Sequence, residues 1–318
     1  MNLPKIHSIS KKILVALVGS FLLIFLLFHA VANLLILRHD DGVWYSDFCH
    51  FMGTNWIVKV FEIILLLTIL AHMALTIWLW IGNRIARGPV RYHKPSRSKT
   101  HQSSKFMMWT GILIFACLIF HFYDFYFVKI GLVKGQYMVE AKALQSDELN
   151  AFSQAAAQYG MTPEDFLAAN EQQLAMYADQ IPPEQKAEID AEMAKLRALV
   201  PVAGIVARSQ NDGDGKWIKG LTHDERVMIQ TALPGVKAEP DFYRMAREKF
   251  THWHIVLGYL VFFFVVFMHL RHAFPSAFQT IGLNNYKYNN VIEILGKLYT
   301  WIVILMFAAV PILVFFGL

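Results

Sequence analysis

Four histidines stand inside long runs of apolar residues, and a fifth follows the last of them. They are His29, His72, His121 and His269, with His272 three positions further on. A neutral imidazole in such a run can bind a metal, pass a proton or hydrogen-bond to a neighbouring helix. Ionisable side chains are costly in apolar segments, so these histidines are the first candidates for chemistry.

The runs that carry the histidines are long enough to cross a membrane as helices. Five such runs occupy residues 12–37, 56–81, 106–130, 253–274 and 291–316. About 20 helical residues cross a hydrocarbon core of about 30 Å. Of the 318 residues, 56% are hydrophobic and only 17% are charged. The sequence predicts an all-α membrane protein with a bundle of five transmembrane helices. A secretory signal ending at Ala30-Val31-Ala32 is less consistent, because the apolar run continues through Leu37.

Charge is sorted along the chain in a way that predicts its orientation. Residues 83–105 contain seven Arg or Lys and no acidic residue, whereas Asp40, Asp41 and Asp47 follow the first run. Under the positive-inside rule the basic segment is cytoplasmic, which puts the N-terminus in the cytoplasm and the C-terminus outside. A multi-pass protein of the inner (cytoplasmic) membrane is expected. The net charge of +5 reflects these short basic segments beside apolar runs, and binding of nucleic acid is not expected.

A polar segment, residues 131–250, separates the part with the first three helices (1–130) from the part with the last two (251–318). It holds 18 of the 24 acidic residues and two helical patterns, Glu164–Ala178 and Pro183–Leu199. We expect a mostly helical extracytoplasmic insert that is either a small cap or a partner-binding module. Its run Asn211–Gly215 suggests calcium, but Leu221 stands where a bidentate glutamate is needed, so a plain turn is the better interpretation.

The four histidines fall at two depths. The histidines lie 16 to 18 residues after the residues at or next to the helix starts, namely Lys12, Trp56, Lys105 and Thr251. This is roughly 24 to 27 Å along the helix axis. Because successive helices run in opposite directions, His29 and His121 are expected near the outer face, and His72 and His269 near the inner face. The two levels are then about 15 to 20 Å apart.

Two facing imidazoles can fill both axial positions of a haem iron, so the two levels predict two b-type haems. The chain has two cysteines and no C-x-x-C-H motif, so thioether attachment is not expected. Zinc would require ligands that converge on one point. Hydrogen bonds within the bundle and a proton or transport pathway are the alternatives, but the carboxylates on these helices, Glu62, Asp124 and Glu293, lie toward helix ends.

The pattern resembles the di-haem, five-helix cytochrome b subunit of succinate:quinone oxidoreductases, which serve as succinate dehydrogenase or quinol:fumarate reductase. The resemblance covers the membrane region and not the insert. Its motifs are Phe28-His29-Ala30, Ala71-His72, Trp109-Thr110-Gly111, Phe120-His121-Phe122 and the stretches His269–Phe274 and Ser276–Leu283.

The resemblance implies that His29 and His121 hold a distal haem and that His72 and His269 hold a proximal haem. His272 is implied as the alternative ligand or as a partner of a haem propionate. The subunit would anchor a flavoprotein and an iron–sulfur subunit on the cytoplasmic side. It would pass electrons to or from a quinone, menaquinone being expected, in the respiratory chain and the tricarboxylic acid cycle, without succinate chemistry of its own. A dimer of the complex is left open.

Three residues near the outer helix ends, Asp47, His50 and Asp124, are candidate quinone contacts. The chain departs from the family in two respects. Phe267 replaces a glutamate that some members use in a proton route, and the insert is longer than is usual. A di-haem cytochrome b of a hydrogenase or formate dehydrogenase is the nearest alternative function, and a transporter without haem is a more distant one.

Overall fold

The computed structural model describes residues 8–89, 102–209, 215–283 and 285–318. It is mostly helical and divides into two compact units. The first unit comprises Met1–Phe122 and Arg247–Leu318, and the second comprises Tyr123–Ala246. Among the described residues five helical segments are long and apolar enough to cross a membrane, which indicates a multi-pass membrane protein.

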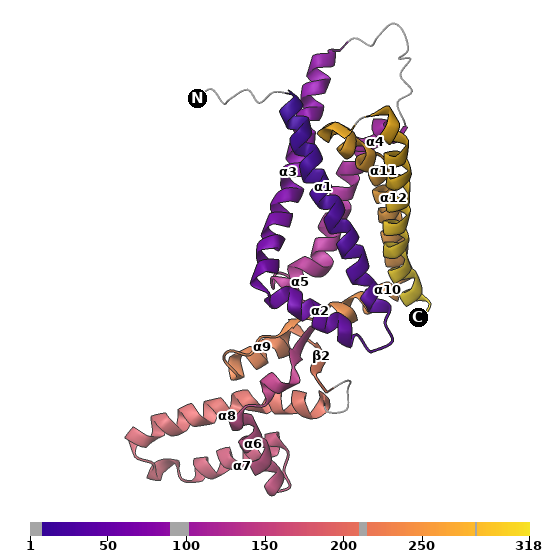
Figure 1. The fold of residues 1–318 in the computed structure, drawn as a ribbon. Coiled ribbons are helices and arrows are strands. Elements are labelled where there is room, and N and C mark those ends of the chain that lie inside the picture. Colours follow the sequence, from indigo (N-terminus) through magenta and orange to yellow (C-terminus); the bar gives the residue numbers. More distant parts are fainter. Residues whose placement is uncertain (1–7, 90–101, 210–214, 284) are drawn as a thin grey trace, which may run out of the picture. The chain divides into compact units, whose positions relative to one another are not determined.

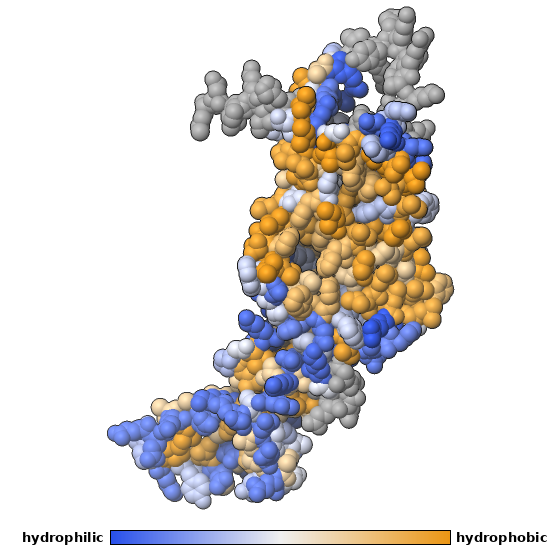
Figure 2. Space-filling model, in the orientation of Figure 1, coloured by the Kyte–Doolittle hydropathy of each residue, from blue (hydrophilic) through white to orange (hydrophobic). Residues whose placement is uncertain are grey.

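The long helices lie together in Figure 1. They are α1 (Ser8–Asn33), α3 (Trp56–Arg87), α4 (Gln102–His121), α11 (Trp253–Phe278) and α12 (Tyr286–Phe315). Figure 2 shows a broad hydrophobic surface over them. Exposed side chains of this kind would be costly in water but are suited to lipid. The expected bundle of five apolar helices is therefore present.

The helix ends differ from the predicted ones where polar residues or proline stand. Helix α3 runs six residues past the predicted end at Ile81, and its last turn contains Arg84 and Arg87, which favour the negative end of the helix dipole. Helix α11 continues through Pro275 into a π-helical segment, Gln279–Leu283. The segment after the first span also contains a helix, α2 (Val43–Thr54), which was not predicted.

Close contacts between α11 and α12 hold one side of the bundle together. A side chain added at Gly296 of α12 would place its Cβ 3.0 Å from a Phe274 ring carbon and 3.3 Å from the Pro275 ring. Gly296 thus lets the backbone of α12 approach α11 closely at Pro275. The Tyr299 hydroxyl donates a hydrogen bond of 2.6 Å to the Leu23 carbonyl and ties α12 to α1.

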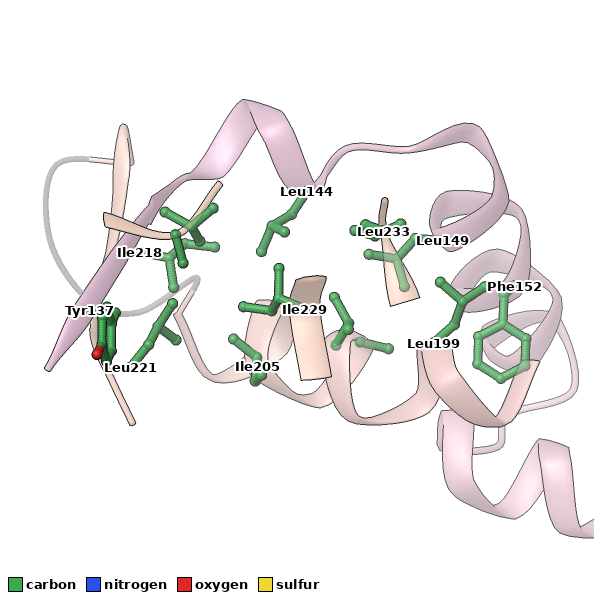
Figure 3. Close-up of a cluster of buried hydrophobic side chains, with 14 of the residues drawn as sticks. Tyr137, Leu144, Leu149, Phe152, Leu199, Ile205, Ile218, Leu221, Ile229 and Leu233 are labelled. Carbon is green, nitrogen blue, oxygen red and sulfur yellow. The ribbon is translucent and has the colours of Figure 1, made fainter. Parts of the chain in front are cut away.

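The second unit has a small sheet and its own core. Strand β1 (Tyr137–Glu140) pairs antiparallel with β2 (Trp217–Leu221) and with β3 (Glu239–Pro240). The remaining helices are α5 (Phe127–Lys129), α6 (Asp147–Gln158), α7 (Pro163–Met176), α8 (Pro183–Ser209), α9 (His223–Ala232) and α10 (Phe242–Phe250). Figure 3 shows buried side chains from β1, β2, α6, α8 and α9 meeting in this core.

Most of this insert is helical, as predicted, but its sheet was not anticipated. The predicted helices Glu164–Ala178 and Pro183–Leu199 correspond to α7 and to a longer α8. The strands are short, and each pairs with a strand far away in the sequence, so no local sequence pattern predicts them. Of the run Asn211–Gly215, only Gly215 lies within the described residues.

The start of α9 shows how charge supports the insert. Thr222 and Glu225 form a capping box, and the Arg208 guanidinium donates a hydrogen bond of 2.6 Å to Glu225. Burial disfavours the Glu225 carboxylate, but these hydrogen bonds outweigh burial and lower its pKa. The charged form therefore stabilises the insert above the usual glutamate pKa, and this contribution is lost as the pH falls through the lowered pKa.

Replacing Gly296 by leucine is expected to destabilise the membrane unit by about 1–3 kcal/mol, because the new side chain overlaps Phe274 and Pro275. Thermal unfolding of the detergent-purified full chain measures this as a lower Tm. Gly258→Leu is the matched control, since Gly258 lies on α11 with no atom within 4 Å of an added Cβ. Equal changes in Tm for the two variants would contradict the close packing at Gly296.

Candidate functional site

Two of the predicted histidines face each other across α1 and α4. The ring centroids of His29 and His121 lie 6.0 Å apart, and the ring planes are inclined by 76°. Phe25 stacks on the His29 ring at 5.4 Å, and Tyr259 of α11 lies edge-on to the His121 ring at 6.4 Å. Aromatic rings from α1 and α11 thus restrict how both imidazoles can turn.

A polar chain on the other side of His29 fixes this ring further. The Asn33 amide nitrogen, one helical turn later, donates to the His29 carbonyl at 2.7 Å and lies 3.3 Å from the ring Nδ1. The Tyr45 hydroxyl of α2 donates to the Asn33 side-chain oxygen at 3.4 Å. Helix α2 is therefore linked to the His29 ring through Asn33.

The other two histidines are His72 of α3 and His269 of α11. Each lies beside a glycine of a neighbouring helix. An added Cβ at Gly19 of α1 would lie 3.4 Å from His72 Cε1, and one at Gly111 of α4 would lie 3.6 Å from His269 Cε1. The glycines leave space for the imidazoles where a larger residue would crowd them.

The positions of Gly19 and Gly111 give the spacing between the two histidine pairs along the helices. Gly19 precedes His29 by ten residues on α1, and Gly111 precedes His121 by ten residues on α4. Ten helical residues correspond to about 15 Å along the axis. Because two helices independently give the same spacing, the pairs lie at two levels of the bundle.

Thr110 of α4 lies beside the ring of His269. Its Oγ1 lies 3.1 Å from His269 Nδ1 and 3.0 Å from the Met107 carbonyl oxygen. When the hydroxyl donates to that carbonyl, Oγ1 can accept a hydrogen bond from Nδ1–H of the His269 ring. In that tautomer the Nε2 lone pair is left for a metal.

The spacing of His29 and His121 fits one metal ion held by two imidazoles. A centroid distance of 6.0 Å is close to that needed for one metal between two rings, with roughly 2 Å for each bond and about 1 Å from nitrogen to ring centre. The buried Nδ1 of His72 has no hydrogen-bond partner among the described residues. Among all the residues that the structure describes, no group of three or more His, Cys, Asp or Glu side chains could hold a metal ion. A cofactor that supplies the remaining ligands, as haem does, suits these pairs.

The other predicted site residues lie outside the two pairs. His272 is half-buried on α11, one turn after His269. Asp47 and His50 are three positions apart on α2 and are half-buried. Asp124 lies in the π-helical turn Phe122–Tyr126, in the second unit.

Sequence reasoning did not assign roles to Asn33 and Thr110. The spacing of Asn33, four residues after His29, could have suggested a contact, because such residues share a helix face. The contact of Thr110 with His269 joins residues 159 positions apart, so only the tertiary structure reveals it.

Comparison of the chain with known protein families, with characterised proteins and with solved structures finds no match. The function must therefore be inferred from the residues and their geometry.

A chemical cross-link tests the pairing directly. In a background with Cys49 and Cys117 replaced by serine, the double variant His29→Cys/His121→Cys is expected to be joined by a short bis-maleimide, because the two side chains face each other. Mass spectrometry of the digested full chain detects the joined peptides. His29→Cys/His269→Cys is the control, since these residues belong to different levels, and more efficient joining of that pair would contradict the arrangement.

Proposed function

We propose that this chain is the membrane-anchor subunit of a succinate:quinone oxidoreductase and binds two b-type haems. One observation carries the proposal: His29 and His121 face each other, and His72 and His269 lie beside glycines that precede His29 and His121 by ten residues on α1 and α4. A single histidine often hydrogen-bonds within a bundle, but four histidines at two levels, two at each level, match the needs of two bis-imidazole haems.

In this proposal each pair of helices supplies one pair of ligands. His29 and His121 hold one haem, and His72 and His269 hold the other. Each bound haem supplies reversible one-electron oxidation and reduction of its iron. His269 is preferred to His272 because its Nδ1 lies 3.1 Å from the Thr110 hydroxyl and because Gly111 leaves space beside its ring. His272 then has a supporting role, one turn away.

The orientation of the chain decides which pair serves which partner. The His72 pair is the nearer of the two to the basic end of α3, which carries Arg84 and Arg87. Under the positive-inside rule that end is cytoplasmic, where the iron–sulfur and flavoprotein subunits would dock. The protein would then lie in the cytoplasmic membrane with its N-terminus inside and its C-terminus and insert outside.

The quinone, menaquinone by resemblance, is proposed to bind near the His29 pair. Helix α2 carries Asp47 and His50 and is linked to His29 through Tyr45 and Asn33. Asp47 and His50 are the proposed polar contacts of the quinone in the membrane unit. Phe267 stands two residues before His269 and cannot carry a proton, so no carboxylate route is proposed there.

Haem content tests the proposal. A reduced-minus-oxidised spectrum of the purified chain is expected to show b-type absorption from two haems. His72→Ala or His269→Ala should remove one haem, and His29→Ala or His121→Ala should remove the other, as resolved by redox titration. His254→Ala, at the opposite end of α11 from His269, is the control and should retain both. Loss of the same haem from the His29 and His72 variants would refute the pairing.

The Thr110 hydroxyl provides a second readout. Thr110→Val removes the acceptor for His269 Nδ1–H, which makes the imidazole less basic and less able to stabilise ferric iron. The midpoint potential of the haem held by His72 and His269 is therefore expected to rise, while the other stays unchanged. Thr280→Val is the control, because that hydroxyl donates to the Ser276 carbonyl. An unchanged potential in Thr110→Val would argue for His272 as the ligand.

Co-purification identifies the complex. A tagged chain is expected to bring down a flavoprotein and an iron–sulfur protein with succinate:quinone reductase activity. A hydrogenase or formate dehydrogenase subunit in their place would assign the haems to a different respiratory complex.

A further inference from the structure

Three helices of the second unit, α6, α7 and α8, form a lobe whose apolar side chains are incompletely covered. Helix α7 has no buried residue. Phe166 and Leu174 on this helix are only half-buried, and Met176 and Tyr177 are 69% and 52% exposed. In Figure 2 hydrophobic residues on this lobe are bordered by hydrophilic ones. The lobe thus leaves an apolar surface open within polar surroundings.

The open surface forms a groove of about 740 Å³ between these helices. Phe166, Leu174 and Tyr177 line one side, and Ile189 and Leu196 of α8 line another. Phe152, Met193 and Leu199 also line the groove, and these three side chains are buried. The groove is therefore a preformed feature that rests on the core of the unit.

The lobe around the groove is strongly acidic. Residues 147–199 contain ten Asp or Glu and three Lys or Arg. Glu148, Glu192 and Lys195 stand at the groove itself. Two of the three basic side chains are already paired within the lobe, Lys195 with Glu192 and Arg197 with Glu171. An occupant that is apolar on one face and cationic around it would be complementary to this surface.

The distribution of the charges selects the kind of occupant. A small cation could meet only one or two of the carboxylates, which are spread over all three helices. An anionic lipid surface would be repelled by the same charges. An amphipathic helix, with apolar anchors at positions i, i+3, i+4 and i+7 and basic residues beside them, can use the groove and the charge together.

We propose that the groove between α6, α7 and α8 is a docking site for a basic amphipathic helix of a partner protein. The insert would then recruit a second protein to this subunit, independently of whether the histidine pairs hold haem.

A synthetic peptide tests this proposal on the full chain in nanodiscs of neutral phosphatidylcholine. The probe is a Leu/Lys peptide of about 18 residues, long enough to be helical, with leucines at the anchor positions. Saturable binding, measured by fluorescence anisotropy after subtraction of empty nanodiscs, is expected to weaken as salt is added. The same peptide with Glu in place of Lys should bind at least ten-fold more weakly.

Two pairs of variants locate the binding. Ala151→Trp places a large ring at an exposed position that lines the groove and should weaken binding at least ten-fold. Ala157→Trp, an equally exposed position of α6 outside the groove, should bind as the wild type does. Glu148→Lys/Glu192→Lys should weaken binding about ten-fold, whereas Glu184→Lys/Glu188→Lys, with the same change in net charge outside the groove, should weaken it less than three-fold.

Several outcomes would overturn the proposal. They are absence of saturable binding, equal binding of the anionic peptide, and unchanged binding to both groove variants. Light scattering provides the remaining check. If the wild type is an oligomer that Ala151→Trp dissociates, the groove is filled by a second copy of this chain and not by a partner.

Discussion

Inside hydrocarbon every backbone N–H and C=O must find a hydrogen-bond partner within the protein, because no water is present to replace it. A helix satisfies these groups locally, so the segments that cross the membrane here are helices. The constraint also fixes a scale, since each helical residue advances about 1.5 Å. Position in the sequence therefore translates into depth in the membrane. The two levels of histidines and the ten-residue spacing on α1 and α4 depend on this rigidity.

The site requires more than correct depth. Imidazoles from different helices must approach each other, and the neighbouring helix must leave room, which Gly19 and Gly111 do. Each ring must also present a particular nitrogen. The Thr110 hydroxyl lies within hydrogen-bond distance of His269 Nδ1, while aromatic neighbours and Asn33 restrict His29. Small residues and hydroxyls of adjacent helices thus convert apolar spans into a set of oriented ligands.

The insert folds around a hydrophobic core of its own. Buried side chains such as Tyr137, Leu221 and Ile229 come from strands and helices and meet in one cluster. The acidic lobe of α6, α7 and α8 differs, because some of its apolar side chains stay exposed beside an excess of negative charge. In a monomeric domain such a patch is a disadvantage unless something covers it. The two units therefore combine an electron-transfer scaffold, as proposed, with a surface suited to recruitment.

The sequence alone determined the five spans, because about 20 consecutive apolar residues are a signal that tertiary contacts do not alter. It also predicted which histidines share a level, since helical rise and alternating direction are local properties. The tertiary structure decided what depends on distant residues. The contacts of Gly19 with His72, of Thr110 with His269 and of Tyr45 with Asn33 join separate helices. The passage of α11 through Pro275 relies on the space at Gly296 of α12. The short strands of the insert and its open groove likewise arise from packing between segments, which no local pattern encodes.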